Sequence, residues 1–372
     1  MVRPAGRATA EGTRRYVSRF TALLKAGHYR DLQGLAASSI GLGTYLGPDD
    51  SLTDRCYIEA ITEAVRSGCN VLDSAINYRC QRSERCIGTA LTDLIESGSL
   101  RRDEVIVATK GGFIPFDGSL PSDPDDYFRR TFVDTGIAAA EDVVAGCHVM
   151  TPSYIRNQLA KSLENLNLEC VDIYYVHNPE TQLSEVDRAE FLRRLRAVFE
   201  CLEAEAAGGR LQFYGTATWD GYRNDASEPD HLSLADILGI AREVAGEKHR
   251  FRVVQLPYNL AMTEALVRPT QSIDGQPAPL LMVAGRLGVY TMSSASILQG
   301  KLASGLPPEI SQRLDGLSTD AQRAIQFVRS SPGLGTALVG MKSRDHVREN
   351  MAVAAAPPVP GAEIRSLFRK AG

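Results

Sequence analysis

Residues 70–78 read Asn-Val-Leu-Asp-Ser-Ala-Ile-Asn-Tyr, and the rest of the chain is interpreted around this stretch. Its apolar residues predict a short buried strand over residues 71–75, with the carboxylate of Asp73 near the carboxyl end. A carboxylate that leaves water is unfavourable unless it is paired or hydrogen-bonded. We therefore expect Asp73, and Tyr78 five residues further on, to meet polar partners that other parts of the chain supply.

A helix is predicted on either side of this strand, and the same alternation continues along the chain. Apolar residues recur at three- and four-residue steps over residues 52–67 and again over residues 83–96. The other predicted strands cover residues 39–45, 104–110, 170–177, 211–218, 251–258, 288–293 and 336–341. The other predicted helices cover residues 152–166, 186–206, 232–245, 280–287 and 319–330, and a last one begins at Asp345. Eight strand–helix units with near-continuous apolar strands favour an α/β fold of the TIM-barrel type, a (β/α)8 barrel.

The alternative is a doubly wound parallel sheet, which usually carries a glycine-rich phosphate loop after an early strand. Neither G-x-G-x-x-G nor G-x-x-x-x-G-K-[ST] occurs, and the nearest approach, Gly41-Leu42-Gly43, lacks the third glycine. We therefore predict a single barrel domain over residues 37–372, preceded by an N-terminal extension over residues 1–36. Its two long connections, an insertion at 111–151 and a segment at 259–279, follow strands, so we expect both at the carboxyl face, where barrel enzymes hold their sites.

Composition excludes several other classes of protein. With 372 residues, 44% hydrophobic and 23% charged, the chain is globular, and a net charge of −4 gives no basic face for nucleic acid. No apolar run is long enough to span a membrane. We expect a cytoplasmic location, with a mitochondrial-type presequence as the alternative because the first residues are rich in Arg, Ala and Thr. Seven cysteines without a C-x-x-C pair and six histidines without metal-ligand spacing predict neither a disulfide framework nor a metal site.

Four polar residues end predicted strands or follow them closely, namely Asp73, Tyr78, Lys110 and His177. Because consecutive strand ends are neighbours in a barrel, these four side chains are expected to converge. An ammonium group lowers the pKa of a nearby tyrosine, a carboxylate holds that ammonium in place, and a histidine can orient a carbonyl oxygen. Together they would form a proton-donating site for carbonyl reduction or its reverse. The structural alternatives are a buried Asp73–Lys110 salt bridge, a core histidine and a packed aromatic.

In this pattern the chain resembles the aldo-keto reductase family, whose Asp, Tyr, Lys and His are matched by these four residues. The resemblance covers about residues 36–355 in order. The neighbouring sequence segments that carry the resemblance are GLGTYLG, SERCIGTAL, SLENLNLECVDIYYVHNPE, VVQLPYN and ALVGMKSRDHVREN.

The resemblance implies an oxidoreductase that uses NADPH (NADP+) to reduce an aldehyde or ketone to an alcohol, with the proton coming from Tyr78. Gln255 would hold the nicotinamide amide, and Tyr290 would stack on the nicotinamide ring. The other implied cofactor contacts are Thr218, Ser294, Leu298, Gly300, Gly340, Lys342, Ser343, His346, Glu349 and Asn350. Lys342 and Ser343 at a helix amino terminus would also suit an anion on physical grounds.

The sequence also departs from the family pattern in two places. Ala217-Thr218 replaces the usual Ser-Asn pair, and Thr291-Met292-Ser293 replaces the usual Ser-Pro-Leu. The lone tryptophan, Trp219, either lines the substrate pocket or simply packs. One alternative function is an NADPH-binding regulatory or sensor subunit with slow turnover, similar to the auxiliary subunits of potassium channels. Another is a pathway-specific reductase that acts on an imine, a sugar or a carrier-bound intermediate. The expected partner is a small-molecule carbonyl compound, and the oligomeric state stays open.

Overall fold

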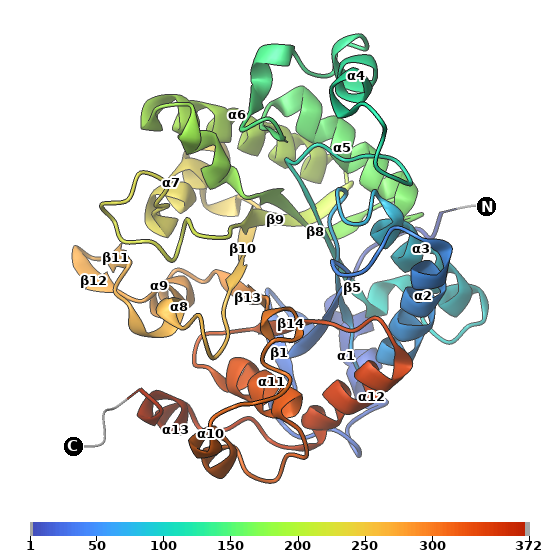
Figure 1. The fold of residues 1–372 in the computed structure, drawn as a ribbon, viewed down its shortest axis with the longest axis vertical. Helices are drawn as coiled ribbons and strands as arrows, with labels where there is room; N and C mark the ends of the chain where they lie inside the picture. The colour runs from blue at the N-terminus through green and yellow to red at the C-terminus, as the bar shows by residue number, and fades with distance from the viewer. Residues whose placement is uncertain (1–2, 369–372) are drawn as a thin grey trace.

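Eight parallel strands close into a barrel in the computed structural model, which describes residues 3–368. Around the barrel they follow the order of the chain (Figure 1). They are β3 (Ile40–Gly43), β4 (Val71–Asp73), β5 (Ile106–Gly111), β8 (Val171–His177), β9 (Leu211–Ala217), β10 (Phe251–Pro257), β13 (Tyr290–Ser294) and β14 (Thr336–Gly340). The (β/α)8 barrel predicted from the sequence is thereby confirmed.

Helices surround the strands on the outside of the barrel (Figure 1). They are α2 (Ser51–Arg66), α3 (Arg82–Glu96), α5 (Pro152–Asn165), α6 (Arg188–Ala207), α7 (Leu234–Ala245), α9 (Leu280–Arg286), α11 (Asp320–Ser330) and α12 (Arg344–Met351). Polar side chains fix where several of them begin, because the first backbone N–H groups of a helix need an acceptor. Asp50 accepts from the Thr53 N–H at 2.7 Å before α2, and Ser343 accepts from the His346 N–H before α12.

The barrel strands are buried on both faces, as their apolar runs predict. All seven residues of β8 are buried. Side chains on the outer face pack against the helices, while Val71, Ile106 and Ile173 belong to a separate cluster that fills the barrel. A packed interior of this kind leaves room for a site only at an end of the barrel.

The two long connections form small structures of their own. The segment 111–151 contains α4 (Pro124–Phe128), β6 (Val143–Val144) and β7 (His148–Val149), and its aromatic residues Phe128 and Phe132 pack together with Tyr154 of α5. The segment 259–279 contains α8 (Glu264–Val267) and the hairpin of β11 (Gln271–Ile273) and β12 (Gln276–Ala278), which lies beside α7 and α9. Two short helices, α10 (Pro308–Arg313) and α13 (Gly361–Ser366), complete the fold.

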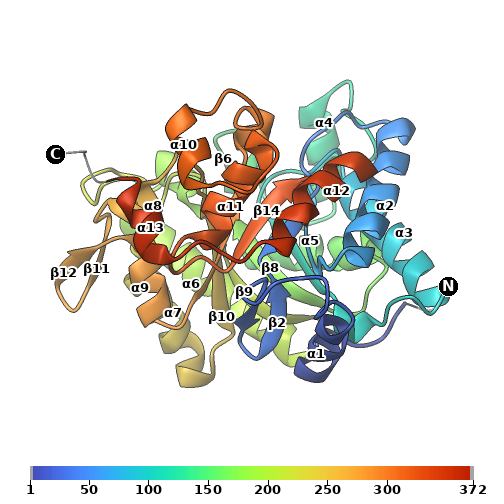
Figure 2. The same cartoon turned by 90° about the horizontal axis from the view of Figure 1, so that it is seen from below.

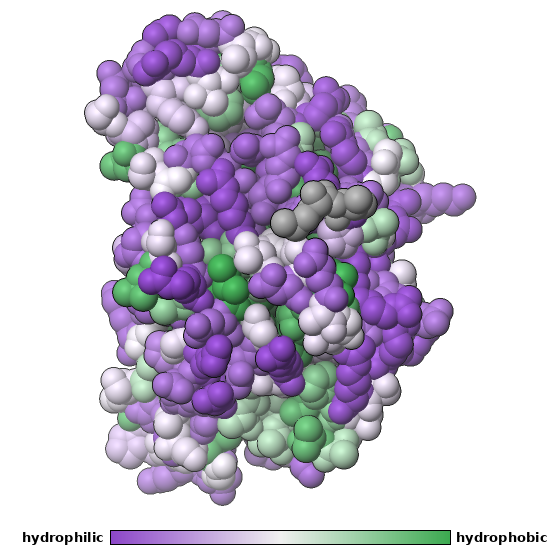
Figure 3. Space-filling model, turned by 90° about the vertical axis from the view of Figure 1, so that its right-hand side faces the viewer, coloured by the Kyte–Doolittle hydropathy of each residue, from purple (hydrophilic) through white to green (hydrophobic). Residues whose placement is uncertain are grey.

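The surface is mainly hydrophilic on the face shown in Figure 3, with apolar side chains in scattered groups. Within residues 3–368, no helix is both long enough and apolar enough to cross a membrane.

The N-terminal segment lies against the amino end of the barrel, opposite α10 and α4 (Figure 2). It contains α1 (Ala10–Ser18) and the antiparallel hairpin of β1 (Tyr29–Leu32) and β2 (Leu35–Ser38). Leu32 and Leu35 are buried against the side chains that fill the barrel, so this segment completes the core at that end. The division of the chain at residue 36 stays a prediction, and residues 1–2 and 369–372, which it also covers, lie outside the described residues.

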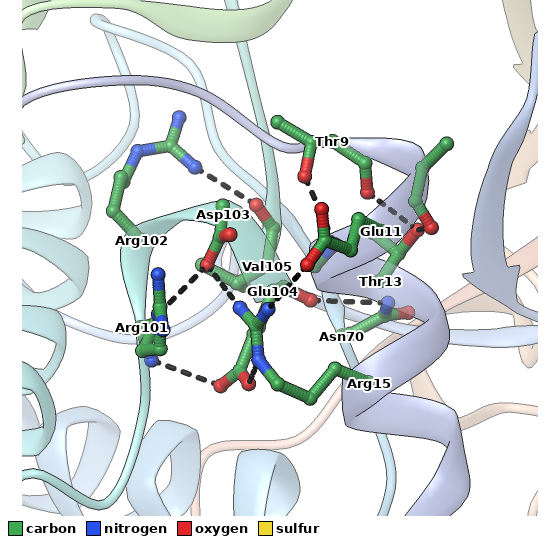
Figure 4. A network of polar contacts seen from close by, with 12 residues as sticks. Thr9, Glu11, Thr13, Arg15, Asn70, Arg101, Arg102, Asp103, Glu104 and Val105 are labelled. Atoms are coloured by element: carbon green, nitrogen blue, oxygen red, sulfur yellow. Dashed lines mark hydrogen bonds and ion pairs between the residues drawn. The ribbon is translucent and has the colours of Figure 1, made fainter.

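Ion pairs fasten α1 to the barrel (Figure 4). Arg15 Nε lies 2.8 Å from Glu104 Oε1, and Arg15 Nη2 lies 2.6 Å from Asp103 Oδ1 in the turn η1 (Arg102–Glu104). Arg19 reaches the same Glu104 oxygen at 2.5 Å. The side chain of Glu104 has no exposed surface, so its charge depends on these arginines.

Removing Arg15 is expected to destabilise the fold. Arg15→Ala takes two charge-assisted hydrogen bonds from acidic groups and should lower the free energy of unfolding by about 1–3 kcal/mol. Urea denaturation would measure this loss. The control is Arg14→Ala, because Arg14 is exposed on the same helix and should change stability by less than about 0.5 kcal/mol. Equal stability of the two variants would contradict the role given to the network.

Candidate functional site

A cavity of about 870 Å³ opens at the carboxyl end of the barrel. Asp73, Tyr78 and His177 line it, and the fully buried Lys110 lies against Asp73 and Tyr78. The structure therefore brings together the four residues that the sequence singles out. They converge because β4, β5 and β8 are consecutive in the barrel and end at the same face.

Lys110 is the centre of this group. Its Nζ donates to Asp73 Oδ1 at 2.6 Å and to the Ser74 carbonyl at 2.7 Å. The same ammonium lies 3.4 Å from the Tyr78 hydroxyl and 4.8 Å from the centre of the Tyr78 ring. All three donor directions of the ammonium are thus used within the protein, and one of them leads to the tyrosine.

Gln255 adds a link that the sequence does not reveal. From β10 its Nε2 donates to Asp73 Oδ2 at 2.8 Å, so both oxygens of the carboxylate are bound. The neighbours β3 and β5 flank β4, whereas β10 lies elsewhere around the barrel. This hydrogen bond therefore crosses the barrel, and no local sequence pattern encodes such a contact.

Burial dominates the electrostatics of the pair. It disfavours a charged Lys110, but the charges and hydrogen bonds of Asp73 and Tyr78 outweigh it, so the pKa of Lys110 lies above its ordinary value. Burial raises the pKa of Tyr78, and the Lys110 ammonium only partly reverses that effect. The sequence-based expectation of a lowered tyrosine pKa therefore describes the effect of the lysine alone. The side chain of Tyr78 is protonated and neutral near pH 7, and the nearby ammonium would stabilise its phenolate form.

His177 faces Tyr78 with aromatic rings around it. Its ring centre lies 5.8 Å from that of Tyr78 and 5.0 Å from that of Phe113, both nearly edge-on. Burial, followed by the charge of Lys110, lowers the pKa of His177 well below its usual range. The imidazole is therefore neutral near pH 7 and can take part in a hydrogen bond to an oxygen.

Most of the residues implied as cofactor contacts lie at this cavity. Those that line it are Thr218, Gln255, Ser294, Gly300, Gly340, Lys342, His346, Glu349 and Asn350. Leu298 and Ser343 do not line it, although Ser343 caps α12 beside it. Two of the lining residues, Asn77 and Thr218, have buried side-chain oxygens without a hydrogen-bond partner in the structure, which suits a polar ligand.

Tyr290 also lies away from the cavity lining, and the expectation that it stacks on a ligand ring at this site is wrong. It is the first residue of β13, so it lies at the amino end of the barrel, whereas Ser294 at the other end of the strand lines the cavity. Its ring belongs to the barrel-filling cluster, and its hydroxyl lies 2.9 Å from Thr336 Oγ1.

Two exposed aromatic residues also lie at the cavity: Tyr45, which the sequence did not single out as a site residue, and Trp219, for which it left pocket lining and packing open. Tyr45, which is 55% exposed, packs edge-on against Tyr78, and Trp219, which is 42% exposed, lines the cavity rather than only packing in the core. Their signal is position, because Tyr45 ends a predicted strand and Trp219 directly follows one. Of the described residues of the insertion, Phe113 alone lines the cavity, and the segment 259–279 contributes none. Across residues 3–368 no cluster of three His, Cys, Asp or Glu residues could hold a metal ion.

Comparison with known proteins gives a consistent picture. A sequence model described as "Aldo/keto reductase family" matches residues 39–302. An NADH-specific methylglyoxal reductase of Escherichia coli (strain K12) is 31% identical over 149 residues, which are 38% of this chain and 39% of the relative's length. A probable voltage-gated potassium channel subunit beta of Oryza sativa subsp. japonica is 23% identical over 356 residues, covering 87% of this chain and 90% of that protein.

Solved structures agree at the level of the fold. An aldo/keto reductase from Klebsiella pneumoniae, solved in complex with NADP and acetate, superimposes with a TM-score of 0.59 at 20% identity. The match covers 92% of this chain and 94% of that one. At this identity the likeness concerns the architecture alone.

Removing one partner of the buried ion pair is expected to cost more than removing both. Asp73→Asn leaves the Lys110 ammonium without a counter-ion and should lower the free energy of unfolding by about 3–5 kcal/mol. The double variant Asp73→Asn/Lys110→Met removes the buried charge and should recover much of that loss, as urea denaturation would show. Asp93→Asn, at an exposed position of α3, is the control. A double variant less stable than Asp73→Asn would contradict the buried-charge argument.

Proposed function

The chain belongs to the aldo/keto reductase family, and from this premise we propose that it is an NADPH-dependent oxidoreductase that reduces an aldehyde or ketone to an alcohol. The observation that carries the proposal is the placement of Lys110 Nζ, 2.6 Å from Asp73 and 3.4 Å from the Tyr78 hydroxyl, beside a cavity that Tyr78 lines. This is the arrangement that a buried proton donor needs, because the ammonium stabilises the phenolate left after the proton departs.

When bound, NADPH supplies the hydride that reduces the carbonyl carbon. Tyr78 donates its hydroxyl proton to the carbonyl oxygen, and Lys110 stabilises the resulting phenolate. One carboxylate oxygen of Asp73 holds the Lys110 ammonium in place, and the other accepts a hydrogen bond from Gln255, which fixes the carboxylate. The neutral His177 orients the carbonyl oxygen next to Tyr78. General acid catalysis by a positioned side chain typically contributes about 10²–10⁴-fold to a rate.

The cavity supports a dinucleotide as its occupant. Its volume of about 870 Å³ falls within the usual range for ligand pockets. Thr218, with its unpartnered hydroxyl, would hold the nicotinamide end, and Gln255 lies nearby. Lys342 and His346 would hold the adenosine 2′-phosphate at the amino end of α12, where a cation favours NADPH over NADH. The Klebsiella structure holds NADP, whereas the Escherichia coli relative is named NADH-specific, so the preference needs a direct test.

A second candidate is a regulatory subunit that binds NADPH and turns over slowly. It is favoured by the potassium channel subunit of rice, which matches along 90% of its own length. Stopped-flow oxidation of bound NADPH against a panel of aldehydes and ketones separates the two candidates. Turnover within seconds favours the reductase, and a bound cofactor that no carbonyl compound oxidises favours the subunit.

Tyr78→Phe tests the proposed mechanism, because it removes only the hydroxyl. The variant should lose at least about 100-fold in kcat for carbonyl reduction, since it has no proton to donate. Its Kd for NADPH, measured by fluorescence quenching, should stay nearly unchanged. Tyr290→Phe removes a hydroxyl that contacts Thr336 and does not line the cavity, and it serves as the matched control. Turnover retained by Tyr78→Phe would refute the role assigned to Tyr78.

Lys342→Ala tests which cofactor the cavity favours. The loss of a charge-assisted contact with the 2′-phosphate should raise the Kd for NADPH about tenfold. The Kd for NADH, which has no such phosphate, should change less than about twofold. The control is Lys248→Ala, because Lys248 is exposed and does not line the cavity. Equal effects on the two cofactors would contradict the proposed place of the phosphate.

A further inference from the structure

His148 is a buried histidine that does not line the cavity, yet it contacts the backbone of His177, which does. It lies on β7, in the returning half of the insertion, and has no exposed surface. β7 pairs with Phe113 across an isolated bridge, and the Phe113 ring meets both imidazoles edge-on, at 5.2 Å from His148 and 5.0 Å from His177.

The key contact is a hydrogen bond between His148 Nε2 and the carbonyl oxygen of His177, at 2.7 Å. β5 ends at Gly111, which is paired with Val176, so the ladder between β5 and β8 stops one residue before His177. On the other side, the Asn178 N–H donates to the Ala217 carbonyl at 2.6 Å. The histidine side chain thus supplies the contact on the flank of His177 where the strand β5 has ended.

The surrounding hydrogen bonds fix the tautomer of His148. Arg194 of α6 has only donors, and its Nη1 lies 2.7 Å from Gln182 Oε1. The Gln182 amide nitrogen therefore points at His148 Nδ1, 2.9 Å away, and donates to it. With Nδ1 accepting, Nε2 carries the hydrogen and donates to the His177 carbonyl. Burial lowers the pKa of His148 to about 4, in agreement with a neutral ring.

The backbone leaves little freedom at this place. Gly112 has φ +145, and a Cβ on it would lie 2.6 Å from His148 Nε2 and 2.9 Å from the His177 carbonyl oxygen. Any side chain larger than hydrogen would therefore separate the two hydrogen-bonded groups. The close approach indicates that a glycine at 112 is required for the imidazole of His148 to reach the strand end.

We propose that His148 is a positioning residue that holds the end of β8 so that the His177 imidazole faces Tyr78, which makes the insertion a support for the reaction rather than a lid over the substrate. The inference rests on the proposed function, because it assigns to His177 the orientation of the carbonyl oxygen. Displacement of a reacting group by about 1 Å can cost up to about 100-fold in rate.

Two substitutions separate hydrogen bonding from packing. His148→Gln keeps a donor near the position of Nε2, and His148→Leu fills a similar space without one. We expect His148→Leu to lower kcat about tenfold and His148→Gln to stay within about threefold of wild type, both with an unchanged Kd for NADPH. Retention of kcat by a folded His148→Leu, or an equal loss in His148→Gln, would overturn the proposal. If His148→Leu fails to fold, Gln182→Leu takes its place, because it removes the donor that fixes the hydrogen of His148 on Nε2. Gln182→Leu should then lower kcat, and an unchanged kcat would overturn the proposal.

A double-mutant cycle distinguishes positioning from general damage. In a His177→Gln background, His148→Leu should cause no further loss of kcat, while its effect on the free energy of unfolding should persist. If His148→Leu lowers kcat in that background by the same factor as it does in the wild-type protein, His148 does not act through His177.

Imidazole ¹H–¹⁵N spectra give a readout besides activity. The chain has six histidines, and the His177 signals are identified by their loss in His177→Gln. His148→Leu should shift them, and His148→Gln should shift them less. If wild type reduces no carbonyl compound, the proposed function fails, and unchanged His177 signals in His148→Leu would then overturn the placement as well. If wild type is active and the His148 variants show the same kcat and the same His177 signals as wild type, this inference fails while the proposed function stands.

Discussion

The buried ion pair between Lys110 and Asp73 is the interaction on which the site depends. A fully buried ammonium is tolerated only when its charge is matched, and here the match comes from the next strand of the barrel. Because Gln255 of β10 binds the second carboxylate oxygen, the pair also connects strands that are not neighbours. The complete set of contacts around Asp73 therefore exists only in the closed barrel.

Burial then keeps the other two groups uncharged. It raises the pKa of Tyr78 and lowers that of His177, so both side chains are neutral at the same pH. The charge of Lys110 stabilises the phenolate form of the first and disfavours the imidazolium form of the second. One ammonium thus acts in opposite directions on the two groups, which is what the roles proposed for Tyr78 and His177 require.

The insertion shows how a segment acts on a site that it barely touches. A long connection after a strand is expected to cover the pocket, yet only Phe113 of this segment lines it. The rest folds around its own aromatic cluster, and His148 reaches the end of β8 from behind. The contact needs Gly112, which brings β7 close enough for a side chain to replace a missing strand neighbour.

The sequence by itself determined the barrel and the group of Asp73, Tyr78, Lys110 and His177, because apolar periodicity marks strands and neighbouring strands end side by side. The family resemblance misplaced Tyr290, because it matched this residue by its neighbours in the sequence. In the structure Tyr290 lies at the amino end of β13, and its ring belongs to the cluster that fills the barrel. The sequence also could not give the contact of Gln255 with Asp73 or that of His148 with His177. Only the tertiary structure decided these, because contacts between distant segments depend on how the barrel closes and how loops pack over it, and no local periodicity records that.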